Sequence, residues 1–181
     1  MIRPERPDDA DAVRAVNDAA FSQPNEARLV DALRGRESVV SLVADLDPPS
    51  PAPRQPNALA GYGEASRVVG HILFSRIAIE PTTPALALAP MAVLPAHQRR
   101  GIGSALVRRG LDECARLGHR IVVVLGHPAF YPRFGFVRAR PLGILPPLDW
   151  PDDAWMVMAL VPGALHGVHG TVRYPPAFDG V

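Results

Sequence analysis

The segment Gln98-Arg99-Arg100-Gly101-Ile102-Gly103-Ser104-Ala105-Leu106 decides how this 181-residue chain is interpreted. Two glycines stand where a strand-like stretch gives way to a helical pattern, and glycine lets the backbone turn tightly or approach a ligand closely. The first N–H groups of a helix have no partner within the helix and lie at the positive end of its dipole. The segment therefore predicts an anion site suited to a pyrophosphate, with Arg99 and Arg100 as further donors.

Two other nucleotide-binding motifs do not fit these residues. The chain contains no GK[ST] sequence, which excludes a phosphate-binding loop of the Walker type. The run Gly101 to Leu106 lacks the third glycine of the dinucleotide fingerprint, and no acidic residue stands where a ribose would need one. A glycine-containing helix start that binds no ligand stays open at this point.

The residues on either side of the segment predict a strand–helix–strand unit. A strand is expected over 85–94 and a helix over 103–117, where Leu106, Leu111 and Cys114 share an apolar face and Gly118 follows as a stop. The run 121–125 is rich in β-branched residues, as in a strand buried on both faces. This order favours a right-handed crossover and an α/β fold.

The rest of the chain predicts further strands and helices around this unit. Strands are expected over 2–4, 38–46 and 68–79. Asp8 and Asp9 are candidate caps for a helix that ends near Phe21, and Asn25 is a candidate cap for a second helix that Gly35 stops. Five prolines fall within 47–57, so the chain is expected to be a single domain, 1–181, with a proline-rich loop insertion at about 47–66.

Composition excludes several classes of protein. The net charge of +1 argues against a general nucleic-acid binder, and the 48% of apolar residues argues against disorder. The long uncharged run 81–98 holds four prolines and cannot form one membrane-spanning helix. With a charged N-terminus and one cysteine, Cys114, the chain is expected to be cytoplasmic, without disulfides and without a metal site.

Several segments, in this order, resemble the GNAT superfamily of N-acetyltransferases. Residues 98–103 match the family's Q/R-x-x-G-x-G/A signature, and the strand-like run 88–95 precedes it at the family's spacing. Residues 130–136, Phe-Tyr-Pro-Arg-Phe-Gly-Phe, resemble the family's Y-x-x-x-G-F element. The tail 170–178 resembles that of a bacterial subgroup of small predicted acetyltransferases. The resemblance covers nearly the whole chain except the proline-rich segment.

The resemblance implies a mixed, strongly twisted sheet with helices on both faces and a central β-α-β unit that binds acetyl-CoA. It implies direct acetyl transfer to a primary amine of a small molecule or peptide, with Tyr131 as the acid that protonates the departing thiolate. Pro90 predicts a bulge or an edge in its strand, which would free backbone groups for the pantetheine arm. The implied CoA-binding residues are Met91, Ala92, Val93, Gln98, Arg99, Arg100, Gly101, Ile102, Gly103, Ser104, Ala129 and Phe130.

The base that would accept the amine proton is not fixed by the sequence. The strand 85–94 carries no carboxylate, although family members often use a glutamate. Glu26 and His127 are the candidates, and each also has an ordinary structural interpretation, as a first-turn glutamate and as a loop histidine. The missing strand carboxylate keeps open a non-catalytic CoA-binding sensor or partner-binding module. The resemblance is also compatible with a homodimer. The sequence does not identify the acceptor amine.

Other residues are ambiguous at this level. Trp150 and Trp155 either line an acceptor pocket or simply pack, and the tail around Tyr174 either covers the cleft or forms an extended edge. Cys114 is spaced as a core residue rather than as a nucleophile.

Overall fold

The computed structural model describes residues 1–46 and 68–179. The proline-rich segment expected as an insertion at about 47–66 lies outside the described residues. Within them, no helix is long and apolar enough to cross a membrane.

The described part of the first two-thirds of the chain follows the expected order of elements. Its strands and helices lie within a few residues of the ranges that hydrophobic periodicity predicts. They are β1 (Ile2–Pro4), α1 (Ala10–Phe21), α2 (Asn25–Leu33), β2 (Ser38–Asp45), β3 (Val68–Ile79), β4 (Thr83–Val93), α3 (Ile102–Arg116) and β5 (Ile121–Leu125), with short 3-10 helices η1 (Pro7–Asp9) and η2 (Pro95–His97).

The last third of the chain consists of short elements that the sequence did not predict individually. Strands of two to five residues show too little alternation to be separated from loops by pattern alone. The elements are η3 (Tyr131–Phe134), β6 (Val137–Arg138), η4 (Arg140–Leu142), β7 (Ile144–Leu145), β8 (Trp155–Ala159), β9 (Gly170–Arg173) and η5 (Pro176–Phe178).

The strands form a mixed sheet in the order β1-β2-β3-β4-β5-β8-β6, with β9 paired to the end of β3 and to β7. Neighbours along this order run antiparallel except β4 and β5, which are parallel and are connected through α3. The mixed sheet and the central β-α-β unit are as expected from the sequence.

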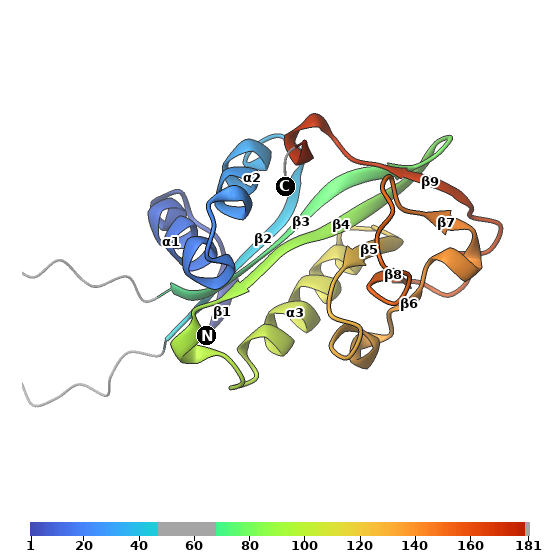
Figure 1. Ribbon diagram of the computed structural model, residues 1–181. Helices are drawn as coiled ribbons and strands as arrows, with labels where there is room; N and C mark the ends of the chain where they lie inside the picture. The colour runs from blue at the N-terminus through green and yellow to red at the C-terminus, as the bar shows by residue number, and fades with distance from the viewer. Residues whose placement is uncertain (47–67, 180–181) are drawn as a thin grey trace, which may run out of the picture.

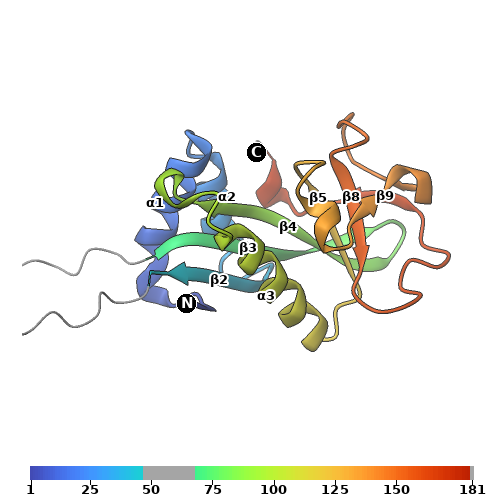
Figure 2. The ribbon, with the colours of Figure 1, turned by 90° about the horizontal axis from the view of Figure 1, so that it is seen from below.

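Helices cover both faces of the sheet (Figures 1 and 2): α1 and α2 lie on one face and α3 on the other. Side chains alternate between the faces along a strand. On β3, Ile72 and Phe74 therefore pack in the core under α3, whereas Leu73 packs with residues of α1 and α2. Each face has its own apolar core, and the sheet is held between them.

The start of α1 differs in detail from the expected capping. Asp9 occupies the residue before α1, but its side chain makes no hydrogen bond to the helix. Its carboxylate accepts the Arg6 N–H at 2.7 Å and two guanidinium bonds from Arg3 at 2.6 and 2.8 Å. The hydrogen bonds from Arg3 lower the pKa of Asp9. At α2, Pro24 stands in the cap position and Asn25 is the first helical residue.

A buried polar chain joins both helices of one face to the sheet. His71 is fully buried on β3; its Nδ1 lies 3.3 Å from the Asn17 amide of α1 and its Nε2 lies 3.0 Å from the Ser41 hydroxyl of β2. The Ser41 hydroxyl donates to Glu5, which also accepts from Arg34 at 2.7 and 3.1 Å. Burial alone would raise the pKa of Glu5, but His71, Ser41 and Arg34 together lower it to about 2. The chain fixes α1 and α2 on the sheet.

The contact between α3 and β3 depends on one glycine. A Cβ built at Gly110 would lie 2.3 Å from Cε2 of Phe74, and both residues are buried. The helix can approach the strand this closely only because position 110 has no side chain.

We predict that Gly110→Ala destabilises the protein by about 1–2 kcal/mol, because overpacking outweighs the gain in helix propensity of roughly 1 kcal/mol. Urea unfolding monitored by circular dichroism measures the change. Arg109→Ala, at the adjacent exposed position of α3, is the control and should shift stability by less than about 0.5 kcal/mol. Equal stability of Gly110→Ala and the wild type would contradict this packing account.

Candidate active site

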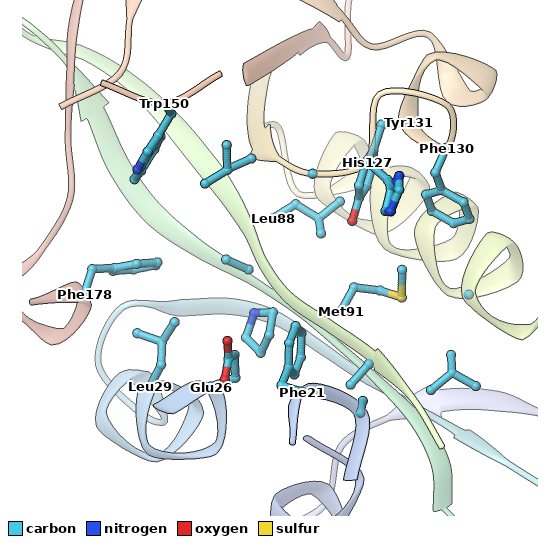
Figure 3. Close-up of a pocket in the computed structure, with 18 of the residues that line it drawn as sticks. Phe21, Glu26, Leu29, Leu88, Met91, His127, Phe130, Tyr131, Trp150 and Phe178 are labelled. Carbon is cyan, nitrogen blue, oxygen red and sulfur yellow. The ribbon is translucent and has the colours of Figure 1, made fainter. Parts of the chain in front are cut away.

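A cavity of about 1500 Å³ opens where the sheet, the start of α3 and the C-terminal segment meet. Its walls come from α1, α2, β4, the end of β5, η3, β9 and η5 (Figure 3). Residues separated by more than 150 positions in the chain, such as Phe21 and Phe178, therefore face the same space. Its partly apolar lining is typical of small-molecule sites, and its volume exceeds the roughly 300–1,000 Å³ of most such sites.

The cavity exists because β4 and β5 separate. Their parallel pairing covers only Leu86 with Val122 and Ala87 with Val123. Beyond this point β4 continues to Val93 and pairs only with β3, while β5 ends at Leu125. The two strands diverge toward their carboxyl ends, where ligands bind in open α/β sheets.

A bulge in β4 coincides with this separation. Ile72 pairs with Met91 and Phe74 with Leu88, so two steps along β3 oppose three steps along β4. Pro90 lies in the extra stretch, which has no partner on β3, so the N–H that proline lacks is not needed for the ladder there. The sequence-based expectation of a bulge or an edge at Pro90 is thus met on both counts, because the bulge lies where β4 is paired on one side only.

The main chain after the bulge alternates in direction. Leu94 donates to the Val69 carbonyl at 2.9 Å, so its N–H points to β3, and antiparallel geometry directs the N–H of Ala92 the same way. The N–H groups of Met91 and Val93 then point away from β3, into the gap beside β5. The Val93 carbonyl, on that side, accepts the Gln98 amide at 3.0 Å. Ala92, expected to offer its main chain to the cavity, lines it while its main chain faces β3.

The start of α3 forms one end of the cavity. Gly101 has φ +83°, and a Cβ there would meet nothing within 4 Å, so the space in front of it is open. The first helical bond runs from Ala105 N–H to Gly101 C=O at 2.9 Å, which leaves the N–H groups of residues 102–104 without a helical acceptor. No acidic residue lies in this first turn. A Cβ at Gly103 would lie 3.4 Å from the Met91 sulfur, an ordinary contact.

Tyr131 lines the cavity between the start of α3 and the part lined by α1, α2 and η5. Its ring is 7% exposed, with its centroid 5.0 Å from that of Phe130 and 5.6 Å from that of Phe136. Figure 3 shows its hydroxyl directed toward the middle of the cavity. A Cβ at Gly126 would lie 2.2 Å from the Tyr131 ring, so Gly126 is needed for this position. Burial raises the pKa of Tyr131, which keeps it a neutral proton donor.

The two candidate bases lie on different parts of the cavity wall. Glu26 is half-buried on the first turn of α2, and its two oxygens accept the Gln23 amide at 3.0 and 3.3 Å. Within residues 1–46 and 68–179, no cationic side chain forms an ion pair with Glu26. His127 is exposed in the turn between β5 and η3, and its carbonyl accepts the Phe130 N–H at 2.9 Å.

Most residues expected at the site do line this one cavity. Arg100 and Ala129 are the exceptions; both are exposed and neither lines it. The backbone at Arg99, with φ +60°, turns the chain so that residue 99 faces the cavity and residue 100 does not. The expected residues that line it are Glu26, Met91, Ala92, Val93, Gln98, Arg99, Gly101, Ile102, Gly103, Ser104, His127, Phe130 and Tyr131.

Sequence reasoning missed much of the cavity wall that lies opposite the start of α3. Phe21 and Leu29 carry no signal beyond helical periodicity, and Phe178 none beyond the family-like tail. Of the two tryptophans, Trp150 lines the cavity, whereas Trp155 is fully buried and donates its indole N–H to the Ile144 carbonyl at 3.0 Å. The tail residue Tyr174 also lines the cavity.

The described part of the chain offers neither a metal-binding cluster nor a cysteine that faces the cavity. No group of three or more histidine, cysteine or carboxylate side chains that could hold a metal occurs among residues 1–46 and 68–179. Cys114 is fully buried on α3, and burial raises its pKa to about 12, so it is a core residue.

Comparison with known proteins gives one family match and relatives over most of the chain. Residues 58–138 match the acetyltransferase (GNAT) domain family. The chain is 31% identical to the uncharacterised N-acetyltransferase YhbS of Escherichia coli (strain K12) over 182 residues, which span 99% of this chain and 98% of that protein. It is 35% identical to the uncharacterised N-acetyltransferase YjhQ of the same strain over 84% of this chain and 80% of that protein. The chain therefore belongs to the GNAT family of N-acetyltransferases.

Solved structures agree with this assignment. The crystal structure of E. coli YhbS, a GNAT family N-acetyltransferase in complex with CoA, matches with a TM-score of 0.84 and 30% identity, over 99% of this chain and 91% of that chain. A GNAT family acetyltransferase from Brucella melitensis in complex with acetyl-CoA matches with a TM-score of 0.75 and 33% identity, over 99% and 97%. The GNAT-like fold expected from the sequence is thus confirmed.

Proposed function

We propose that this protein binds acetyl-CoA and transfers the acetyl group directly to a primary amine. The observation that carries the proposal is the separation of β4 from β5 beside a helix N-terminus that is free of acidic residues. The gap leads from that N-terminus to the Tyr131 hydroxyl (Figure 3). The bound CoA and acetyl-CoA of the two similar structures support the choice of cosubstrate.

The residues of this chain suit the different parts of acetyl-CoA. The unpaired N–H groups at residues 102–104 and the Arg99 side chain would bind the pyrophosphate. The N–H groups of Met91 and Val93 would hydrogen-bond the pantetheine arm, and the one nearer the thioester would polarise its carbonyl. An N–H aimed at a developing oxyanion lowers the barrier by a few kcal/mol, roughly 3–4 in measured cases. The Phe130 ring would pack along the arm.

The chemistry needs a neutral amine and a proton for the thiolate. The amine arrives as an ammonium ion and loses one proton to a base. Its nitrogen then forms the new C–N bond to the acetyl carbon while the C–S bond breaks, and the sulfur takes its proton from the Tyr131 hydroxyl. The second proton released by the nitrogen restores Tyr131, so the net products are the acetamide, the CoA thiol and one proton.

We assign the base role to Glu26 rather than to His127. Glu26 is half-buried, has no cationic partner among the described residues, and lies on the wall that faces Tyr131 across the cavity in Figure 3. His127 is exposed in its turn.

A covalent acetyl-cysteine route is not proposed, because Cys114 is buried away from the cavity. The single buried cysteine is in keeping with a reducing compartment such as the cytoplasm.

We predict that Gly101→Ala weakens acetyl-CoA binding about tenfold or more, measured as Kd by titration calorimetry. The new Cβ would enter open space where the pyrophosphate is proposed to lie, and φ +83° adds strain of about 1–2 kcal/mol. Gly118→Ala is a matched control, because Gly118 has φ +85° and open surroundings at the other end of α3. Both variants should lose similar stability. Equal Kd values for the two would contradict a pyrophosphate site at Gly101.

We predict that Tyr131→Phe lowers kcat by roughly 10²–10³ and changes the Kd of acetyl-CoA less than threefold. The substitution removes only the hydroxyl and keeps the ring packed against Phe130 and Phe136. Thiol release under saturating acetyl-CoA measures kcat. Unchanged turnover would remove Tyr131 from the acid role, and tight acetyl-CoA binding without transfer to any amine would favour a CoA-binding sensor instead.

A further inference from the structure

The part of the cavity away from the α3 N-terminus is built from aromatic side chains. Trp150, Tyr174 and Phe178 form a continuous wall, with ring centroids 6.0 Å apart for Trp150 and Tyr174 and 4.6 Å apart for Tyr174 and Phe178. All three are half-buried and line the cavity. Figure 3 shows Trp150 and Phe178 facing the same open space as Phe21, Glu26 and Leu29.

This aromatic wall is held in place from behind. The Trp150 ring lies 5.4 Å from that of Trp155, which is fully buried and hydrogen-bonded through its indole to the Ile144 carbonyl. The Trp150 carbonyl accepts a guanidinium bond from Arg140 at 3.1 Å. At the other end, Phe178 packs against the core that contains Leu29. A wall fixed in this way loses little conformational freedom when a ligand packs on it.

One carboxylate faces the space beside this wall. Glu26 and Leu29 are three residues apart on α2, so they share a helix face with Cβ atoms roughly 5–6 Å apart. Leu29 is itself in the core on which Phe178 packs. The Glu26 carboxylate therefore lies about one helical turn from the apolar surface, and its described contact is with the neutral Gln23 amide.

The charges along the cavity are distributed unevenly. At the α3 end the charged or basic lining residues are His97, Arg99, His127 and Arg133, with no carboxylate, which suits an anionic cosubstrate. Away from that end they are Glu26, Glu80, Arg173 and Asp179, of which only Glu26 is half-buried and the other three are exposed. Burial raises the pKa of Tyr174, so the aromatic wall adds no negative charge. A polyamine or an amino sugar would need several buried polar partners, which this wall does not offer.

We propose that the acceptor is a primary amine carried on an aromatic or similarly bulky apolar group, with its ring packed on Phe178, Tyr174 and Trp150 and its ammonium group bound by Glu26. This inference rests on the proposed acetyl transfer and specifies its substrate class. The cation can also lie against the faces of the surrounding rings, which attract it electrostatically.

The test compares three amines with acetyl-CoA as donor: 2-phenylethylamine, ethylamine and spermidine. Thiol release gives kcat/KM, and calorimetry gives the Kd of each amine for the protein saturated with CoA. We expect 2-phenylethylamine to exceed ethylamine by about 100-fold in kcat/KM and to exceed spermidine as well, because the aromatic wall buries the apolar surface of the phenyl group, which both other amines lack. The Kd values should follow the same order, so the result does not depend on turnover alone.

Two variants separate ring recognition from ammonium recognition. Phe178→Ala should weaken the binding of both 2-phenylethylamine and the neutral 2-phenylethanol about tenfold. Glu26→Gln should weaken only the amine, also about tenfold. Leu117→Ala, an exposed position at the end of α3, is the control and should change neither. A merely structural role of Glu26 would not distinguish the charged ligand from the neutral one.

The outcomes distinguish this inference from the function on which it rests. If the folded protein fails to bind acetyl-CoA, the proposed transferase function is refuted, and the inference with it. If acetyl-CoA binds but ethylamine or spermidine equals 2-phenylethylamine in Kd and kcat/KM, the substrate class is wrong and the transferase proposal survives. Unchanged amine binding in both variants would likewise overturn the inference.

Discussion

The short parallel pairing of β4 with β5 is the constraint on which the site depends. Two residue pairs hold the strands together, and the bulge at Pro90 then shifts the register of β4 against β3. The shift points the N–H groups of Met91 and Val93 into the gap instead of into a ladder. In an ordinary sheet these groups would be paired with a neighbouring strand, because buried backbone groups seldom stay unpaired. The open position is thus suited to a ligand with carbonyl and amide groups along an extended arm.

Contacts elsewhere in the fold position the helices and the functional side chains around this gap. Gly110 lets α3 pack closely on Phe74, which positions the helix N-terminus at the wide end of the gap. The polar chain through His71 and Glu5 fixes α1 and α2, and these helices supply the wall that carries Glu26. Gly126 has no side chain and so leaves room for the Tyr131 ring beside the gap. The arrangement is one polarised cavity, with cationic groups at the α3 end and one half-buried carboxylate at the other.

The sequence predicts the cosubstrate end far better than the acceptor end. Gly101 and Pro90 are informative in the sequence itself. Glycine readily adopts a left-handed φ, and proline lacks the N–H that a strand interior needs. Long elements such as α3 and β3 also show clear hydrophobic periodicity. The acceptor wall has no such local signal: Phe21, Trp150 and Phe178 come together only through tertiary packing, and β6 to β9 are too short to show a period. That residue 99 lines the cavity and residue 100 does not follows from a turn at Arg99 that residue types do not reveal.

The most direct test of the account is amide hydrogen exchange, followed by NMR at single residues of β4 with and without acetyl-CoA. The account predicts that the Met91 and Val93 amides exchange quickly in the free protein and become strongly protected when acetyl-CoA is bound. The Ala92 amide, directed to β3, should be protected in both states. Protection of Met91 and Val93 already in the free protein, or no change on acetyl-CoA binding, would contradict the claim that the gap between β4 and β5 is the cosubstrate site.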